Sequence, residues 1–108
     1  MANRFKIDPA DIKDIIQSIG YCVASDKITV EGSSVGFMYR EEPESPDDSG
    51  WRFLSGDETE EYVEDMNNSM IFDVNTIANY DRAIVSYLSM PIGSELERVE
   101  GSDEFSAL

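Results

Sequence analysis

Adjacent acidic residues are the side chains of this sequence best placed to do chemistry. Two neighbouring carboxylates can act as general acid and general base when burial pushes their pKa values apart. Such pairs are abundant and include Glu41/Glu42, Asp47/Asp48, Asp57/Glu58 and Glu60/Glu61. Because the chain holds 23 acidic residues, adjacent pairs arise by composition alone and are typical of solvated surfaces. The pattern therefore favours solvated carboxylates over a catalytic pair.

The side chains on which most other active sites depend are missing. The sequence has no histidine, which excludes Ser-His-Asp catalysis, Cys-His catalysis and imidazole metal ligation. The single cysteine, Cys22, can form neither an internal disulfide nor a thiolate zinc site, and we expect it to be a small buried apolar residue. The stretch that starts at Asp73 does not fit the calcium-binding loop of an EF-hand, because Ile77 and Ala78 occupy the positions that need a ligand and a glycine. We therefore expect no enzyme activity, no cofactor, and no catalytic or metal-binding residue.

Negative charge is concentrated after residue 40. The 23 acidic and 8 basic residues give a net charge of −15. Residues 1–40 carry five of each, whereas residues 41–65 carry eleven acidic residues and one arginine, a net charge of −10. This balance argues against nucleic acid and anionic membranes as direct ligands, because both repel an acidic surface. Two interpretations stay open: self-repulsion that keeps the protein soluble, or a surface complementary to a basic partner.

Trp51 is the most informative single residue of the acidic region. It follows an acidic stretch that ends in glycine, and it opens a predicted strand. One interpretation is a core tryptophan. The other is an aromatic anchor at the margin of a binding surface, since tryptophan is enriched among the residues that dominate interface energetics.

The sequence predicts neither a signal peptide nor a membrane span. Charged side chains interrupt residues 1–20, and the longest apolar run is four residues. We therefore expect a cytoplasmic protein.

An amphipathic helix is predicted at the N-terminal end of the domain, over residues 9–19. Asp8 and Pro9 favour its start, and Gly20 favours its end. Four isoleucines at helical spacing would form one apolar stripe: Ile12, Ile15, Ile16 and Ile19.

The rest of the chain predicts a small, mostly antiparallel sheet with short helices in the C-terminal half. Runs of aromatic and β-branched residues predict strands at 21–25, 27–31, 35–40, 51–54 and 95–99. A hairpin connection at 32–34 and an exposed loop over 41–50 would separate them. Short helices are predicted at 57–63, 75–79 and 81–88. We expect one α+β domain over residues 1–108, with its core at about 7–99 and a frayed acidic tail at 100–108.

Several segments resemble the bacterial immunity-protein thirty-three family. These segments are 22–26, 35–43, 48–53, 56–58, 75–81 and 91–94, and the most specific are Ser49-Gly50-Trp51-Arg52-Phe53 and Gly56-Asp57-Glu58. The resemblance implies an α+β protein that is encoded beside a polymorphic toxin and neutralises it by binding.

The resemblance and the charge pattern together favour stoichiometric, non-covalent inhibition of a basic toxin. An acidic protein can fill a nucleic-acid-cutting site by imitating phosphate charge. The predicted partner-binding residues are Glu41, Glu42, Asp47, Asp48, Trp51, Arg52, Asp57, Glu58, Tyr80 and Asp81. The alternative is an intracellular ligand-binding or regulatory module with no toxin partner, with a pocket near Trp51 and Tyr80.

Overall fold

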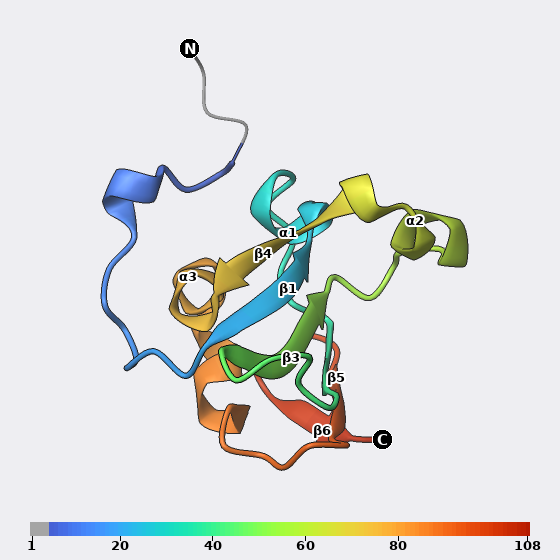
Figure 1. The fold of residues 1–108 in the computed structure, drawn as a ribbon. Helices are drawn as coiled ribbons and strands as arrows, with labels where there is room; N and C mark the ends of the chain where they lie inside the picture. The colour runs from blue at the N-terminus through green and yellow to red at the C-terminus, as the bar shows by residue number, and fades with distance from the viewer. Residues whose placement is uncertain (1–4) are drawn as a thin grey trace.

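A six-stranded sheet organises the part of the chain that the structure, a computed structural model, describes, namely residues 5–108 (Figure 1). The strand order is β4-β1-β3-β2-β5-β6. The β1–β3 pair is parallel and the other four pairs are antiparallel. The strands are β1 (Tyr21–Ser25), β2 (Phe37–Arg40), β3 (Asp48–Leu54), β4 (Ser69–Asp73), β5 (Glu95–Arg98) and β6 (Phe105–Ala107). This arrangement confirms the expected α+β class and the mostly antiparallel sheet.

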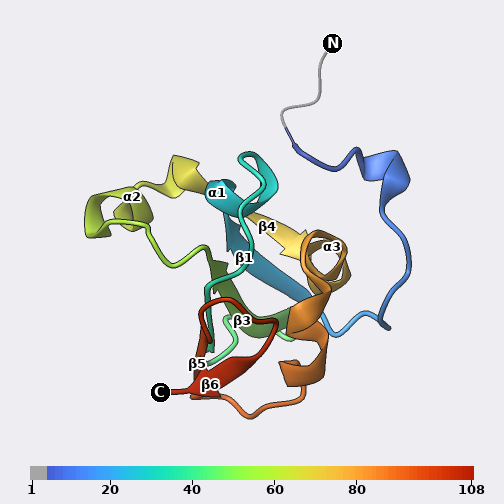
Figure 2. The same ribbon diagram turned by 180° about the vertical axis from the view of Figure 1, so that it is seen from behind.

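One face of the sheet carries the hydrophobic core. Alternate residues of β3 point to opposite faces, so Trp51 and Phe53 both enter the core, where their rings stack with centroids 6.1 Å apart. Apolar side chains from the helical segments pack into the same core, including Ile77 and Ile84. Figure 1 and Figure 2 show these segments lying beside the strands. They are α1 (Asp26–Thr29), α3 (Val74–Tyr80) and the 3-10 helix η3 (Arg82–Tyr87).

The predicted strand at 27–31 is wrong, and so is the hairpin that would follow it. Ser25 ends β1 and caps α1, because its hydroxyl accepts a hydrogen bond from the backbone N–H of Lys27 at 3.2 Å. The helix therefore begins immediately after the strand. Ile28 and Thr29 are fully buried on this single helical turn.

The predicted helix over 9–19 is also wrong, since only Pro9–Asp11 forms a 3-10 turn, η1. Residues 12–20, here called the strap, contain no helical turn. Asparagine side chains of α3 bond to the strap backbone instead. The Asn75 amide oxygen accepts from Ile15 N–H at 2.8 Å and Ile16 N–H at 3.1 Å, and its nitrogen donates to Lys13 C=O at 2.8 Å. Asn79 adds bonds to both backbone groups of Lys13, at 2.9 Å each.

The C-terminal residues form a strand and are not a frayed tail. Residues 105–107 form β6, which pairs with β5. Phe105 is 7% exposed and contacts the Tyr87 ring edge-on, with centroids 5.2 Å apart. The Tyr87 hydroxyl accepts from the Phe105 N–H at 2.9 Å. One aromatic residue therefore fixes a segment whose composition is otherwise polar.

The remaining elements differ from their predicted bounds by a few residues. Helix α2 (Glu60–Glu64) is capped by Thr59, not by Asp57, and the 3-10 helix η2 (Met66–Asn68) follows it. Strand β4, which includes Ile71 and Phe72, lies where the sequence predicted no strand. Strand β3 begins at Asp48, inside the predicted loop.

Replacing Asn75 by Ala should detach the strap without removing a core side chain. The change leaves the Ile15 and Ile16 amides unpaired, so we expect a loss of about 1–3 kcal/mol in the free energy of unfolding. Urea unfolding measures the loss, and amide hydrogen exchange should show faster exchange at Lys13, Ile15 and Ile16. The control is Asn67→Ala, at an exposed residue of η2 whose backbone N–H, not its side chain, bonds to Asp65. Unchanged exchange at the strap in Asn75→Ala would contradict the assigned role.

Candidate functional site

The structure separates the ten predicted partner-binding residues by exposure. Asp48, Trp51 and Arg52 are buried, so they cannot contact a partner directly. The exposed residues are Glu41, Glu42, Asp47 and Asp57, and the half-buried ones are Glu58, Tyr80 and Asp81. The ten predicted residues therefore include buried residues that stabilise the fold and exposed carboxylates that a partner could contact.

Trp51 is a core residue, which resolves the two interpretations that the sequence left open. Its side chain is 0% exposed, and its indole N–H donates to the Leu88 carbonyl at 3.2 Å. The Arg40 guanidinium lies 5.6 Å from the ring centroid. These contacts attach β3 and β2 to the segment after η3. Trp51 therefore stabilises the strands that carry the surface residues and does not itself form part of the surface.

Asp48 and Arg52 form a buried ion pair at the start of β3. The guanidinium donates to both carboxylate oxygens, at 2.8 and 3.0 Å, and its Nε donates to Glu41 at 2.6 Å. The Asp48 carboxylate also accepts the backbone N–H of Glu44 at 3.0 Å and of Gly50 at 2.8 Å. The hydrogen bonds from Arg52 hold the pKa of Asp48 well below its ordinary value. The hydrogen bond to Asp48 likewise raises the pKa of Arg52.

Tyr80 and Asp81 lie at the end of α3 and bond to distant segments of the chain. Asp81 caps η3, accepts the Val35 N–H at 3.0 Å and forms an ion pair with Arg98. The Tyr80 hydroxyl accepts from the Ile7 N–H at 3.3 Å, beside a hollow of about 290 Å³ with a mostly apolar lining. Both side chains thus hold segments of the fold together, and Trp51 does not line this hollow.

The face of the sheet opposite the core, here called the open face, carries two rows of paired residues. Cross-strand partners point to the same side of a sheet. The first row crosses β3, β2 and β5 and consists of Leu54, Phe37 and Glu97. The second row crosses β4, β1, β3, β2 and β5 and consists of Ile71, Val23, Arg52, Tyr39 and Glu95. This face therefore carries apolar and aromatic side chains over β1 to β4, the buried Arg52 among them, and two glutamates on β5.

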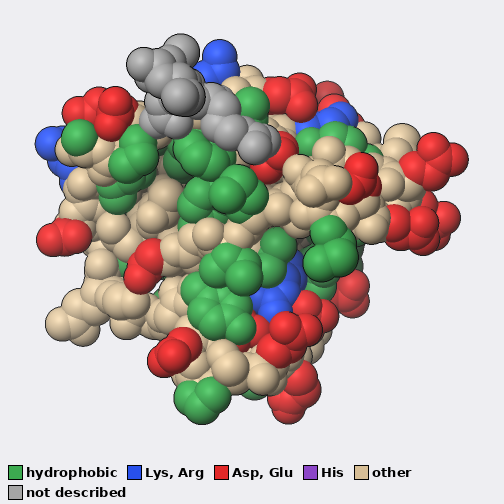
Figure 3. Space-filling model, turned by 45° about the horizontal axis from the view of Figure 1, so that its top comes forward, with side chains coloured by type: hydrophobic (Ala, Val, Ile, Leu, Met, Phe, Trp, Pro, Cys, Tyr) green, Lys and Arg blue, Asp and Glu red, His purple; other side chains and the backbone are tan. Residues whose placement is uncertain are grey.

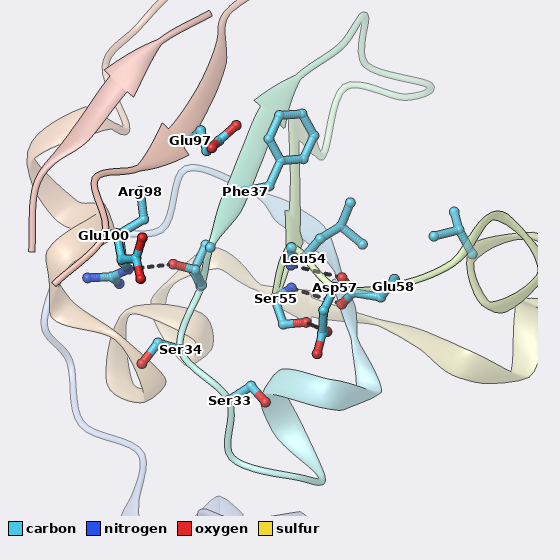
Figure 4. Close-up of a pocket in the computed structure, with 14 residues that line it drawn as sticks. Ser33, Ser34, Phe37, Leu54, Ser55, Asp57, Glu58, Glu97, Arg98 and Glu100 are labelled. Atoms are coloured by element: carbon cyan, nitrogen blue, oxygen red, sulfur yellow. Dashed lines mark hydrogen bonds between the residues drawn. The ribbon is translucent and has the colours of Figure 1, made fainter. Parts of the chain in front are cut away.

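A groove of about 820 Å³ lies over the first row (Figure 4). Phe37 and Leu54 line it from the sheet, and Val63 lines it from α2. Figure 4 shows Asp57 and Glu58 on one side and Glu100 on the other. A smaller hollow of about 260 Å³ lies over the second row, lined by Tyr39, Glu41, Glu44, Arg52 and Tyr62 among others. Leu54 and Val63 line both hollows, so the two are neighbours.

Two of the predicted acidic residues at the groove are held by local hydrogen bonds. Glu58 accepts the backbone N–H groups of Ser55 at 2.8 Å and Gly56 at 2.9 Å. Burial raises the pKa of Glu58, but hydrogen bonds from Ser25 and these backbone groups outweigh it and bring the pKa below its ordinary value. The Ser55 hydroxyl and then Lys27, 3.2 Å away, lower the pKa of Asp57. Both groups are therefore carboxylates near neutral pH.

Acidic side chains outnumber basic ones along the groove, whose lining includes Asp57, Glu58, Glu97 and Glu100 but only Arg98 as a cation. Figure 3 shows acidic side chains crowding the side where α2 projects, with hydrophobic side chains and a basic group between them. Sequence reasoning found Asp57 and Glu58 but missed Phe37, Leu54 and Glu97. The alternation of Glu95-Leu96-Glu97-Arg98 was the available signal, because it places the glutamates on the face opposite Leu96.

Neither a metal site nor a membrane span is found among residues 5–108. No group of three or more acidic, cysteine or histidine side chains in that range could hold a metal ion. No helix there is long and apolar enough to cross a bilayer. The buried Cys22 thiol has a raised pKa because of desolvation, which makes it a poor nucleophile.

The structure is thus a small α+β domain whose sheet has one face against the core and one open face with a groove that acidic residues line. The chain matches the family model described as the immunity protein Imm33 domain over residues 22–108, and it therefore belongs to the Imm33 immunity-protein family. This match confirms the resemblance drawn from the segments between Cys22 and Ser94. No curated protein and no solved structure matches the chain.

Replacing Asp48 by Asn should destabilise the protein, because it leaves Arg52 buried with one weak acceptor in place of a carboxylate. We expect a loss of about 3–5 kcal/mol near neutral pH, measured by urea unfolding. The control is Asp47→Asn, at an exposed neighbour that contributes its backbone carbonyl to Tyr21 N–H.

The same comparison should depend on pH in one direction. The folded-state pKa of Asp48 lies below its ordinary value of 3.8, so its stabilisation is present above that value and is lost as pH falls through the folded pKa. The stability gap between the wild type and Asp48→Asn should be constant above about pH 5 and shrink below about pH 4. A gap that stays constant down to pH 2 would refute this assignment.

Proposed function

We propose that this Imm33 domain neutralises a cognate bacterial toxin by stoichiometric, non-covalent binding through its open face. The observation that carries the proposal is the combination of apolar side chains and exposed carboxylates over the two rows. Binding surfaces need apolar contacts for affinity and complementary charge for fast association. A basic toxin is the partner that this charge fits.

A toxin that acts on nucleic acid is the partner class that best fits the charge. Such a toxin needs a basic surface to hold phosphates, and an acidic protein can occupy that surface. Glu41, Glu42 and Asp47 are exposed residues of the acidic loop between β2 and β3, and they supply charge at one end of the open face. Asp57 and Glu97 supply it at the other end.

Two observations support binding over catalysis. The most perturbed carboxylate, Asp48, is bidentate to Arg52 and fully occupied by four donors, so it has no free position for a substrate. Glu58 is likewise occupied by backbone donors. A general acid or base needs an accessible group near the reacting atom, and the accessible carboxylates here lie on the rim.

A regulatory module with no toxin partner stays the alternative. The observation in its favour is the mostly apolar hollow beside Tyr80, which is close to the lower size limit of small-molecule sites. Such a module would bind a small ligand at Tyr80 and would show no dependence on the acidic open face.

The test is co-purification of the tagged protein with its partner, followed by stopped-flow binding at several ionic strengths. Raising salt should slow association more than it speeds dissociation, because the Debye length is about 8 Å at 0.15 M. Glu42→Gln combined with Asp47→Asn should reduce the association rate constant several-fold and change dissociation less.

The matched control for this charge change is Asp11→Asn combined with Asp14→Asn, which removes one exposed charge just before the strap and one within it. Equal effects from the two double variants would mean that net charge alone controls association. An association rate indifferent to salt and to both variants would refute binding through an acidic surface.

A further inference from the structure

The groove over the first row has an apolar floor, formed by Phe37, Leu54 and Val63, and acidic walls, formed by Asp57 and Glu58 on one side and Glu97 and Glu100 on the other. Cross-strand pairing aligns Leu54, Phe37 and Glu97 on adjacent strands. Leu54 and Phe37 are half-buried at the bottom of the groove. The Val63 side chain of α2, which also lines the groove, is 52% exposed. The floor is thus apolar surface that the fold itself leaves partly uncovered.

The carboxylates around this floor differ in how far they are neutralised. Glu97 and Glu100 are exposed, and within residues 5–108 neither lies within 4.0 Å of a basic side chain. Asp57 is also exposed, and one of its carboxylate oxygens forms an ion pair with Lys27. The groove therefore presents uncompensated negative charge on the β5 side and partly compensated charge on the β3 side.

Arg98 lines the groove but cannot neutralise it. Its guanidinium is already bonded to Asp81, Asp103 and the carbonyls of Val35 and Ser102. It also lies 4.8 Å from the centroid of the Phe105 ring, which keeps it against the core side. A cation that satisfies Glu97 and Glu100 must come from another molecule.

We propose that this groove binds a short basic segment of a partner protein that carries one large apolar side chain between lysines or arginines. The apolar side chain lies on Phe37, Leu54 and Val63, and the flanking cations bind Glu97 and Glu100. The inference rests on the proposed function in so far as this segment belongs to the toxin. Its content is narrower: it assigns the contact to the groove and specifies the partner's chemistry.

Charge complementarity decides between this occupant and others. A second copy of the chain would bring a net charge of −15 to an acidic groove, which opposes association. A nucleic acid would be repelled for the same reason. A purely apolar segment would leave Glu97 and Glu100 without partners, whereas a basic segment satisfies the floor and the walls together.

The groove can be tested without the toxin, using a synthetic peptide as probe. The probe is acetyl-Lys-Arg-Leu-Arg-Lys-amide, and its matched partner has serine in place of leucine. Binding to the ¹⁵N-labelled full chain is measured by NMR chemical-shift titration at 50 mM and 300 mM salt. We expect millimolar binding of the leucine peptide, shifts centred on Phe37, Val63 and Glu97, and affinity at least three-fold weaker for the serine peptide.

Two variants separate the walls from the floor. Glu97→Gln combined with Glu100→Gln should weaken the leucine peptide at least five-fold and reduce its salt dependence. Val63→Ser should weaken the leucine peptide several-fold and leave the serine peptide unchanged. Asp11→Asn combined with Asp14→Asn removes the same number of charges elsewhere and should change binding less than two-fold. Unfolding midpoints of all variants establish that the sheet is intact.

Each outcome decides for or against the groove. Weakening confined to the groove variants supports the proposal. Equal weakening by Asp11→Asn with Asp14→Asn, equal binding of both peptides, shifts centred elsewhere, or no binding at 10 mM peptide overturns it.

The toxin, once co-purified, separates failure of the groove from failure of the proposed function. A toxin that binds the wild type and the groove variants equally leaves neutralisation intact and removes the groove from it. Absence of any toxin binding by the wild type removes the proposed function, and the peptide titration still decides whether the groove binds basic segments.

Discussion

The ion pair between Asp48 and Arg52 determines how the central strand enters the sheet. Asp48 sits where the acidic loop turns into β3, and its carboxylate collects two backbone N–H groups in addition to the guanidinium. At the same place Gly50 adopts a φ of 87°, and a Cβ there would come within 2.4 Å of the Glu41 carbonyl oxygen. The start of β3 can therefore lie against the end of β2 only because the residue midway between Asp48 and Arg52 is glycine.

The sheet on both sides depends on this junction. The Asp47 carbonyl accepts the Tyr21 N–H at 2.8 Å, which begins the parallel contact between β1 and β3. Three residues after Asp48, Trp51 attaches the core-bearing face of the sheet to the segment after η3, because its indole N–H donates to the Leu88 carbonyl. Removing Asp48 leaves the buried guanidinium with one carboxylate, the exposed Glu41, in place of two, so the cost spreads to every strand aligned by β3. The most acidic part of the chain thus holds its own counter-charge inside, and only its outer carboxylates remain for a partner.

The strand pattern was predictable where alternation and turn residues agreed. Tyr21–Ser25 forms a strand with the bounds that its aromatic and β-branched residues predicted. The strands around Trp51 and Glu95 were found for the same reason. The isoleucines of residues 12–19 misled because their spacing fits a helix, while the bonds that shape this segment come from Asn75 and Asn79, more than 55 residues away. No local pattern carries that information.

The candidate site was predictable only in part, for a related reason. Composition marked the acidic residues, but it could not tell Asp48, which faces Arg52 inside the fold, from Asp47, which faces solvent. The apolar floor of the groove was missed because Phe37 and Leu54 become neighbours only through the pairing of β2 with β3. In the same way, Phe105 turns a polar C-terminal segment into a strand through a contact with Tyr87.

The strap is held through its backbone, and this has a consequence for how the sequence can change. Asn75 and Asn79 bond to the amide and carbonyl groups of Lys13, Ile15 and Ile16, which every residue except proline can offer in full. Selection acting on these hydrogen bonds falls on the two asparagines. The side chains of Ile15 and Ile16, which pack against the core, and of Ser18, which donates to Asp73 at 2.8 Å, are constrained separately. The strap also precedes the residues that match the family model. Its exposed positions, such as Lys13 and Gln17, can therefore change while the backbone keeps the same attachment to α3.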